Sequence, residues 1–164
     1  MNILGVDPSL RSTGFGVIAA RGSEFQPVVH GEIKNPAGLP PSRCLVHIGD
    51  TITELIVKHQ PQVMAIEGLV YVQNTRIAFT LGQVRGVIIA AAARHGLEIY
   101  EYAPRKVKQN ITGRGGAGKT QVAQMIKAQL GLTTLPSPDA ADALAIALCH
   151  AHSCRGIGQR PTPL

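Results

Sequence analysis

The chain opens on Asn2-Ile3-Leu4-Gly5-Val6-Asp7-Pro8-Ser9, an apolar run that stops at an acid followed by a proline. A short continuous apolar run bounded by a turn is typical of a buried strand. Two further strands are predicted over residues 14–20 and 28–33, with a turn signal at Arg21-Gly22-Ser23 between them. Three consecutive strands joined by short turns predict an antiparallel meander at the start of the fold.

Helices and strands then alternate along the chain. The predicted order is a helix over 43–59, a strand over 62–66, a helix over 74–95, a strand over 97–102, a short basic helix from Pro104, a helix over 119–130 and a helix over 139–152. This order predicts an α/β domain with a mixed five-stranded sheet and helices on both faces, as in the RNase H-like architecture. We expect a single domain over 1–154 and a flexible tail over 155–164, which is rich in glycine and proline.

Composition indicates a globular protein with a basic surface. Apolar residues make up 45% of the 164 residues, which excludes a disordered chain. Lysine and arginine number 16 against 10 acids, and the net charge of +6 favours a polyanionic partner. Residues 102–137 hold no acid but six basic residues: Arg105, Lys106, Lys108, Arg114, Lys119 and Lys127. A solvated face with a chance excess of one sign is the alternative, and a phosphate-contacting strip fits better.

The sequence favours a cytoplasmic protein with no membrane partner. Three cysteines without a regular framework are typical of a reducing compartment. The first residues turn polar too soon for a signal peptide. The longest apolar stretch, 77–93, is interrupted by Arg85 and is short for a membrane span.

Four of the acids occupy positions that favour a metal site. Asp7 and Glu67 directly follow predicted buried strands, and Asp139 and Asp142 lie three residues apart on one face of the last predicted helix. Converging buried carboxylates repel one another, and a divalent cation relieves that repulsion. Oxygen ligands suit Mg²⁺, and two such ions about 3.5–4 Å apart can hydrolyse a phosphodiester. We assign Asp7 to bridge the ions and Glu67 to orient the water.

Each of these acids also has an ordinary interpretation. Asp7 before Pro8 is a common turn residue. Asp139 could cap the helix or favour its dipole, and Asp142 could be an ordinary first-turn residue. Taken singly, the ordinary interpretation is the more economical one. The combination is less easily dismissed, because the two strands that end in acids are among the most apolar in the chain.

Three segments resemble the signature motifs of the RuvC family of bacterial Holliday-junction resolvases. They are Gly5-Val6-Asp7-Pro8-Ser9, Ala65-Ile66-Glu67 and Asp139-Ala140-Ala141-Asp142-Ala143-Leu144-Ala145. The resemblance extends through 81–86, 102–109 and 113–115 with Lys119, and it covers residues 2 to about 152. The family's first motif usually reads Asp-Pro-Gly, whereas this chain has Ser9.

The resemblance implies an RNase H-like, Mg²⁺-dependent endonuclease, with Mn²⁺ as a substitute, that resolves four-way DNA junctions by paired symmetric nicks in recombination and repair. It implies that Asp7, Glu67, Asp139 and Asp142 are the catalytic and metal-binding residues. Lys108 and Lys119 match lysines implicated in DNA binding and catalysis, and Tyr71 stands next to the position of a stacking aromatic. The implied partners are a second copy of the chain and the branch-migration proteins RuvA and RuvB.

The helix predicted over 74–95 carries small residues at a four-residue spacing. Gly82, Gly86 and Ala90 would permit another helix to approach closely. Packing within one chain is the ordinary interpretation. The resemblance favours a dimer interface along this helix, and a two-fold dimer suits a near-symmetric junction.

Three competing hypotheses stay open from the sequence. Residues 113–120 fit the phosphate-loop pattern G-x-x-x-x-G-K-[ST] of nucleotide hydrolases, but the segment before them does not look like a buried strand. Cys149-His150-Ala151-His152-Ser153-Cys154 could hold zinc, although the spacing is too tight for a common finger. A non-catalytic junction-binding module would use the same basic strip, but it leaves the four acids unexplained.

Overall fold

The computed structural model describes residues 1–68, 74–156 and 162–164. Its strands are β1 (Asn2–Asp7), β2 (Ser12–Arg21), β3 (Glu24–Lys34), β4 (Val63–Glu67) and β5 (Glu98–Tyr102). Its helices are α1 (Pro41–His59), α2 (Thr75–Arg94), α3 (Pro104–Thr112), α4 (Lys119–Leu130) and α5 (Pro138–Ser153). The elements follow the predicted order along the chain, and most bounds agree within a few residues.

The five strands form one mixed sheet in the order β3-β2-β1-β4-β5. β1 pairs antiparallel with β2, and β2 pairs antiparallel with β3, so the predicted meander is present. β4 joins β1 in parallel, and β5 joins β4 in parallel. A parallel neighbour needs a crossover connection, which α1 and α2 supply here. The predicted mixed five-stranded sheet is confirmed.

The hairpin of β2 and β3 is longer than the sequence indicated. Pairing runs out to Arg21 opposite Glu24, across a turn that begins at Gly22 with a φ of +55°. A bulge beside Val17 and Ile18 interrupts the register, and Pro27 pairs opposite Ile18. The sequence prediction started β3 too late, at residue 28 instead of Glu24, because polar residues and a proline resemble a loop. An edge strand tolerates both, since one of its sides has no strand to pair with.

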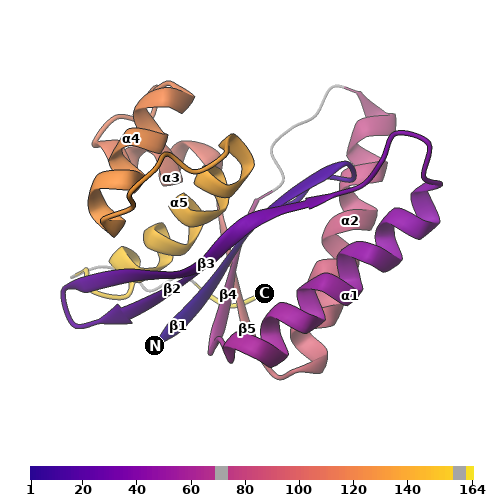
Figure 1. The fold of residues 1–164 in the computed structure, drawn as a ribbon, viewed down its shortest axis with the longest axis horizontal. Helices are drawn as coiled ribbons and strands as arrows, with labels where there is room; N and C mark the ends of the chain where they lie inside the picture. The colour runs from indigo at the N-terminus through magenta and orange to yellow at the C-terminus, as the bar shows by residue number, and fades with distance from the viewer. Residues whose placement is uncertain (69–73, 157–161) are drawn as a thin grey trace.

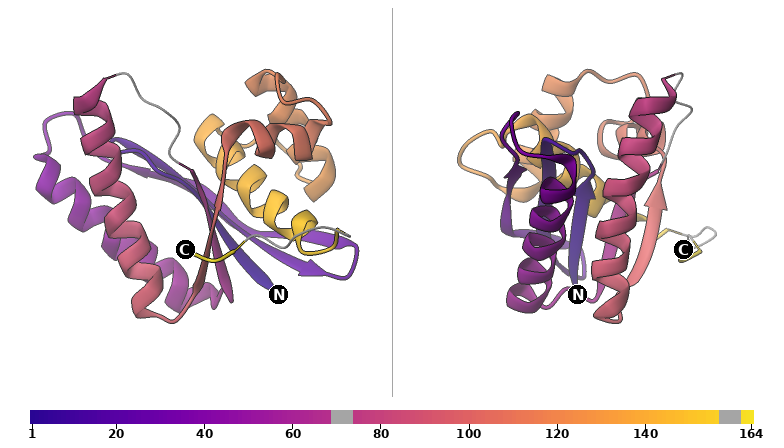
Figure 2. Two further views of the ribbon diagram at one scale, coloured as in Figure 1. Left: turned by 180° about the vertical axis from the view of Figure 1, so that it is seen from behind. Right: turned by 90° about the vertical axis from the view of Figure 1, so that its right-hand side faces the viewer.

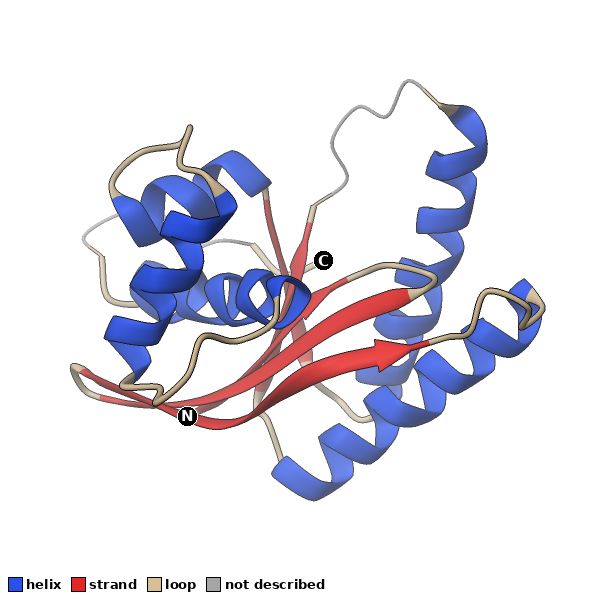
Figure 3. Ribbon diagram, turned by 45° about the horizontal axis from the view of Figure 1, so that its top comes forward, coloured by secondary structure: helices blue, strands red, loops and turns tan. Residues whose placement is uncertain are grey.

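Helices cover both faces of the sheet, and alternating strand residues supply a separate core to each (Figures 1 and 3). Leu4, Val6 and Met64 face α1 and α2. Ile3 and Ala65 face α3, α4 and α5. This alternation follows from the two-residue period of a strand, which sends successive side chains to opposite faces. It also decides the face to which any residue at a strand end belongs.

α5 packs so close to the sheet that position 5 has no room for a side chain. A Cβ at Gly5 would overlap the main-chain oxygen of Ala143, and a Cβ at Gly16 would stand 2.6 Å from Leu144 Cδ2. The helix is rich in alanine and is buried along most of its length. Small residues on both partners therefore bring the middle of α5 against β1 and β2.

α2 has an uncovered apolar side. Within the described residues it is the one helix that is long and apolar enough to cross a membrane by length and composition. It packs against α1 and the sheet, yet Ile77 and Phe79 are exposed.

At the other end of the chain, the backbone amide of Leu164 donates to the carbonyl of Ile99 at 2.8 Å, so the C-terminus lies beside β5 (Figure 2). The flexibility expected for 155–164 stays a prediction.

Candidate active site

Asp7 and Glu67 lie side by side at the carboxyl ends of two neighbouring strands. Asp7 ends β1 and Glu67 ends β4, and the parallel register pairs Val6 with Ile66 immediately before them. Each acid is an even number of residues from Ile3 or Ala65 on its strand, so both belong to the α5 face. Strand alternation and register alone therefore bring the two carboxylates together.

The first turn of α5 brings Asp139 and Asp142 to the same end of the sheet. Pro138 starts the helix, and its fixed φ suits that position. A Cβ at Gly14 would overlap the main-chain oxygen of Asp139, and Gly14 is the strand partner of Asp7. The glycine thus permits the helix start to lie next to Asp7. The hydroxyl of Ser12 donates to the Asp139 carboxylate and fixes its orientation.

Three of the four acids line one cavity of about 380 Å³, which we call the acidic pocket. Asp7, Glu67 and Asp142 line it together with Lys108 of α3 and Lys119 of α4. Asp139 is not among its lining residues and is held beside it by Ser12. A second cavity of about 390 Å³, between residues 8–11 and the start of α2, is lined by no acid. The acidic pocket is therefore the place where the predicted chemistry fits.

Burial and the charges of neighbouring acids disfavour the charged forms of Asp7 and Glu67. Burial, reinforced by the charges of Glu67, Asp142 and Asp139, raises the pKa of Asp7 from 3.8 to about 7. Burial and the charge of Asp142 likewise raise the pKa of Glu67. Lys119 opposes both shifts, and its Nζ lies 3.4 Å from Asp142 Oδ2. A raised carboxylate pKa at a converging cluster is a common property of functional sites.

The donor set of the acidic pocket fits a hard divalent cation. Asp7, Glu67 and Asp142 in the pocket and Asp139 beside it would offer oxygen ligands, which Mg²⁺ prefers, and a cation would offset the burial and repulsion that raise the pKa of Asp7. Among the described residues, no three acid, histidine or cysteine side chains already converge tightly enough to share one ion. Rotation of these side chains toward one another would be needed before three of them could share one ion.

The predicted DNA-binding residues divide into two groups. Lys108 and Lys119 line the acidic pocket. Arg105, Lys106 and Arg114 lie outside its lining on exposed parts of α3 and the following loop, and Lys106 Nζ stands 5.7 Å from the centre of the Tyr102 ring. Tyr71 lies outside the described residues. The basic strip therefore extends from the acidic pocket over α3 and the start of α4.

The predicted dimer residues face outward rather than into the chain. Gly82, Gly86 and Ala90 are exposed on α2, and a Cβ at either glycine would meet no atom within 4 Å. Packing within one chain therefore does not explain the small residues. The uncovered apolar side of the same helix is consistent with a second copy of the chain.

Two of the competing hypotheses lose support from the fold. The glycine-rich segment 113–120 joins α3 to α4, whereas a nucleotide-binding phosphate loop follows a strand. Cys149 is buried among apolar residues, and the Nδ1 of His150 contacts the Tyr102 hydroxyl at 2.9 Å.

Sequence reasoning missed three residues that support the site. Ser12 contacts Asp139, while Arg85 contacts both the main chain of Glu67 and the carboxylate of Glu101. A single arginine inside the apolar stretch 77–93 was a visible signal for Arg85. Its partners lie on other elements, so the sequence alone could not name them.

Comparison with known proteins gives one consistent result. A family model described as Crossover junction endodeoxyribonuclease RuvC matches residues 3–150. The protein of that name from Caldicellulosiruptor saccharolyticus is 44% identical over 159 residues, which cover 96% of each chain. Its counterpart from Rubrobacter xylanophilus is 47% identical over 163 residues, covering 96% of this chain and 91% of the relative. The structure of T. thermophilus RuvC in complex with a Holliday junction substrate matches with a TM-score of 0.92 at 32% identity, covering 100% of this chain and 99% of that one.

Proposed function

Because the chain belongs to the RuvC family of crossover junction endodeoxyribonucleases, we propose that it resolves four-way DNA junctions by paired symmetric nicks in recombination and DNA repair. The observation that carries the proposal is the acidic pocket, in which Asp7, Glu67 and Asp142 meet two lysines. Metal-dependent phosphodiester hydrolysis would use both features, since acids can hold the metal and cations can contact the phosphates. The solved relative that contains a Holliday junction substrate supports four-way DNA as the ligand.

Asp7, Glu67, Asp139 and Asp142 would hold two Mg²⁺ ions, with Mn²⁺ as a substitute. Bound there, the ions would supply an activated water and stabilise the leaving 3′-oxygen. After burial, the charges of all three other acids raise the pKa of Asp7, a central position that would suit a carboxylate shared by the two ions. Glu67, on the neighbouring strand, would orient the attacking water. Ser12 would keep Asp139 turned toward the cluster.

Lys119 would act through its positive charge on the neighbouring carboxylates and on the DNA phosphate, and not as a metal ligand. Its ammonium lies against Asp142 and lowers the pKa of Asp7 and Glu67. It therefore keeps those carboxylates ionised at lower pH than they would be alone. It also presents a positive charge where a scissile phosphate would enter the acidic pocket. Lys108, on the other wall, would hold the same strand.

The remaining basic residues would follow the DNA backbone away from the cut. Arg105, Lys106 and Arg114 lie on α3 and the loop after it, and phosphate contacts of this kind fix position without reading sequence. Tyr71 is our candidate for stacking against a junction base.

Two copies would act together. Gly82, Gly86 and Ala90 give α2 an exposed face that a second α2 can approach, and two active sites related by a two-fold axis match paired nicks in a near-symmetric junction. We propose RuvA and RuvB as further partners. Three cysteines without a regular disulfide framework would suit the proposed cytoplasmic location.

The test compares a synthetic mobile four-way junction with its matched linear duplex, each labelled on one strand at a time. The proposal predicts paired nicks at symmetric positions in the junction, in Mg²⁺ or Mn²⁺ but not in EDTA, and no cutting of the duplex. Equal cutting of both substrates would leave a nuclease without junction selectivity. Tight junction binding with no cutting in either metal would support a non-catalytic binding module instead.

A further inference from the structure

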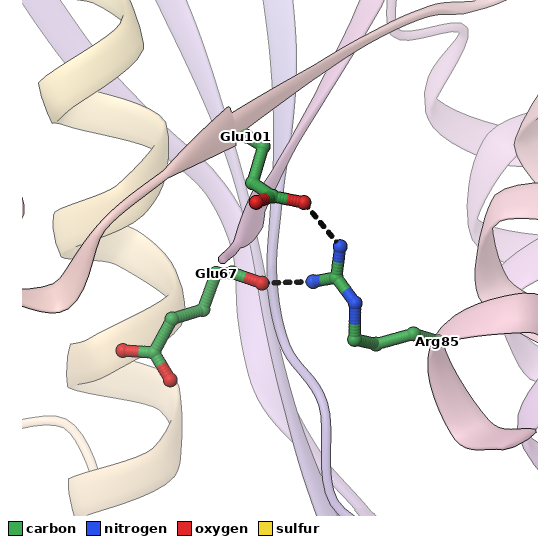
Figure 4. A network of polar contacts seen from close by, with 3 residues as sticks. All are labelled: Glu67, Arg85 and Glu101. Atoms are coloured by element: carbon green, nitrogen blue, oxygen red, sulfur yellow. Dashed lines mark hydrogen bonds and ion pairs between the residues drawn. The ribbon is translucent and has the colours of Figure 1, made fainter. Parts of the chain in front are cut away.

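A buried arginine lies directly behind the acidic pocket. Arg85 of α2 is 6% exposed, although arginine is among the residues least often buried. Its guanidinium donates to the main-chain carbonyl of Glu67 and, at 2.5 Å, to Glu101 Oε2 (Figure 4). One side chain therefore connects α2, the end of β4 and β5.

Stability alone is a poor explanation for this arrangement. Removing a guanidinium from water costs free energy that its ion-pair partners offset only in part. Well-packed apolar residues can often replace a buried ion pair without lowering the stability of the protein. Val84 and Ile88, its neighbours on α2, belong to the apolar core. A third apolar residue between them would have continued that core. The presence of a buried arginine at this position is therefore better explained by the groups that it contacts.

What it contacts is the backbone of a predicted metal ligand. The β1–β4 pairing stops at Val6 and Ile66, one residue before Glu67. On the other side the ladder continues by one hydrogen bond, from the Gly68 amide to the Tyr102 carbonyl at 2.9 Å. Arg85 adds a second hydrogen bond at this strand end, to the Glu67 carbonyl. In Figure 4 the Glu67 carbonyl points toward Arg85, while its carboxylate points away from it, toward the opposite side.

The neighbouring residues are shaped to allow this contact. Glu101 stands opposite Ile66 on β5, and its carboxylate must reach past position 68 to meet Arg85. A Cβ at Gly68 would lie 2.9 Å from Glu101 Oε1 and 3.0 Å from its Cγ. The residue after Glu67 is thus one that leaves room for the Glu101 side chain.

We propose that Arg85, held by Glu101, is a positioning residue that fixes the end of β4 and so directs the Glu67 carboxylate at Asp7. The inference rests on the proposed metal-dependent cleavage. Arg85 touches neither the substrate nor the reacting atoms, and it acts through the Glu67 backbone.

The test uses Arg85→Met, Arg85→Lys and Glu101→Gln in the full chain. Two matched controls remove the same charges elsewhere: Arg94→Met on the exposed end of α2 and Glu98→Gln on β5. For each variant we would measure the single-turnover rate of junction cleavage, junction affinity in EDTA, the melting temperature, and Mn²⁺ binding to the metal-free protein by electron paramagnetic resonance.

Support of a metal ligand by a neighbouring residue is commonly worth 10–100-fold, so Arg85→Met should lose about 10–100-fold in rate and bind Mn²⁺ more weakly. Junction affinity should not change, and Arg85→Lys should recover part of the loss. Glu101→Gln should lose less than Arg85→Met and add little to it in the double variant. Should Arg85→Met fail to fold, Glu101→Gln carries the same test.

Wild-type rates and Mn²⁺ affinity in both Arg85→Met and Glu101→Gln would overturn the inference. A rate loss that merely follows a fall in melting temperature and junction affinity would overturn it too, because it would show a structural role. If wild type itself fails to cleave, the proposed function fails, and Mn²⁺ binding still decides whether Arg85 positions Glu67.

Discussion

Replacing Asp7 by asparagine should stabilise the metal-free protein at alkaline pH. Burial and three neighbouring acids raise the pKa of Asp7 from 3.8 to about 7 in the folded state. Between those two pH values the folded chain binds more protons than the unfolded chain, so the free energy of unfolding falls as pH rises. Three pKa units correspond to about 4 kcal/mol, and asparagine escapes that loss because it carries no charge.

Asp7 keeps some contact with solvent, so we expect about 2 kcal/mol of the possible 4 at pH 8. For a chain of this length that is a rise of roughly 4–8 °C in melting temperature. Thermal melts in EDTA from pH 4 to pH 8 measure it, with Asp50→Asn on the exposed side of α1 as the control. The advantage of Asp7→Asn should vanish near pH 4. An Asp7→Asn protein no more stable than wild type at pH 8 would refute the reasoning.

Three further changes test other parts of the site. Gly14→Ala should lower the free energy of unfolding by about 1–3 kcal/mol and slow cleavage, because the new Cβ would push the start of α5 away from Asp7. Melting and cleavage assays should show no such effect for the control Gly38→Ala, because a Cβ at Gly38 would meet no atom within 4 Å. Lys119→Met should slow cleavage about 10²-fold and move the rising limb of the pH–rate profile to higher pH, because the Lys119 charge lowers the pKa of Asp7 and the variant lacks that charge. A pH–rate profile that does not move would count against this role of Lys119. Gly86→Glu should convert a dimer to a monomer in light scattering by placing like charges on the exposed face of α2, and an unchanged dimer would place the interface elsewhere.

The fold followed from the sequence where periodic patterns are strong. The apolar run ending at Asp7 and the one ending at Glu67 predicted two buried strands, and the parallel pairing of β1 and β4 agrees with that prediction. The apolar face of α1 and the proline at the start of α5 gave their bounds within a few residues. The predicted α/β class with helices on both faces is confirmed by the close structural match.

The extent of the β2–β3 hairpin could not be predicted from local pattern. Residues 24–27 look like a loop in sequence, and only pairing with an already formed β2 makes them a strand. The bulge beside Val17 has the same origin, since it depends on how two strands align rather than on either strand alone. Tertiary pairing here overrides local preference.

The site was predictable in its residues but not in its supports. Asp7 and Glu67 could be placed together because strand ends meet at one edge of a sheet, and their catalytic roles stay predictions. The Ser12 contact to Asp139 joins residues 127 positions apart and depends on where α5 crosses β2. Arg85 was visible as an interruption of an apolar stretch, but Glu101 became its partner only through the packing of α2 on β5.

The most direct test of the account compares four single variants, Asp7→Asn, Glu67→Gln, Asp139→Asn and Asp142→Asn, in one assay. For each, single-turnover cleavage of a four-way junction in Mg²⁺ is measured beside junction binding in EDTA. The account predicts that every variant loses about 10³-fold in rate or more while binding is kept, because each carboxylate serves one metal-dependent centre. A variant that binds the junction and cleaves it at the wild-type rate would contradict the account, since that acid would lie outside the chemistry.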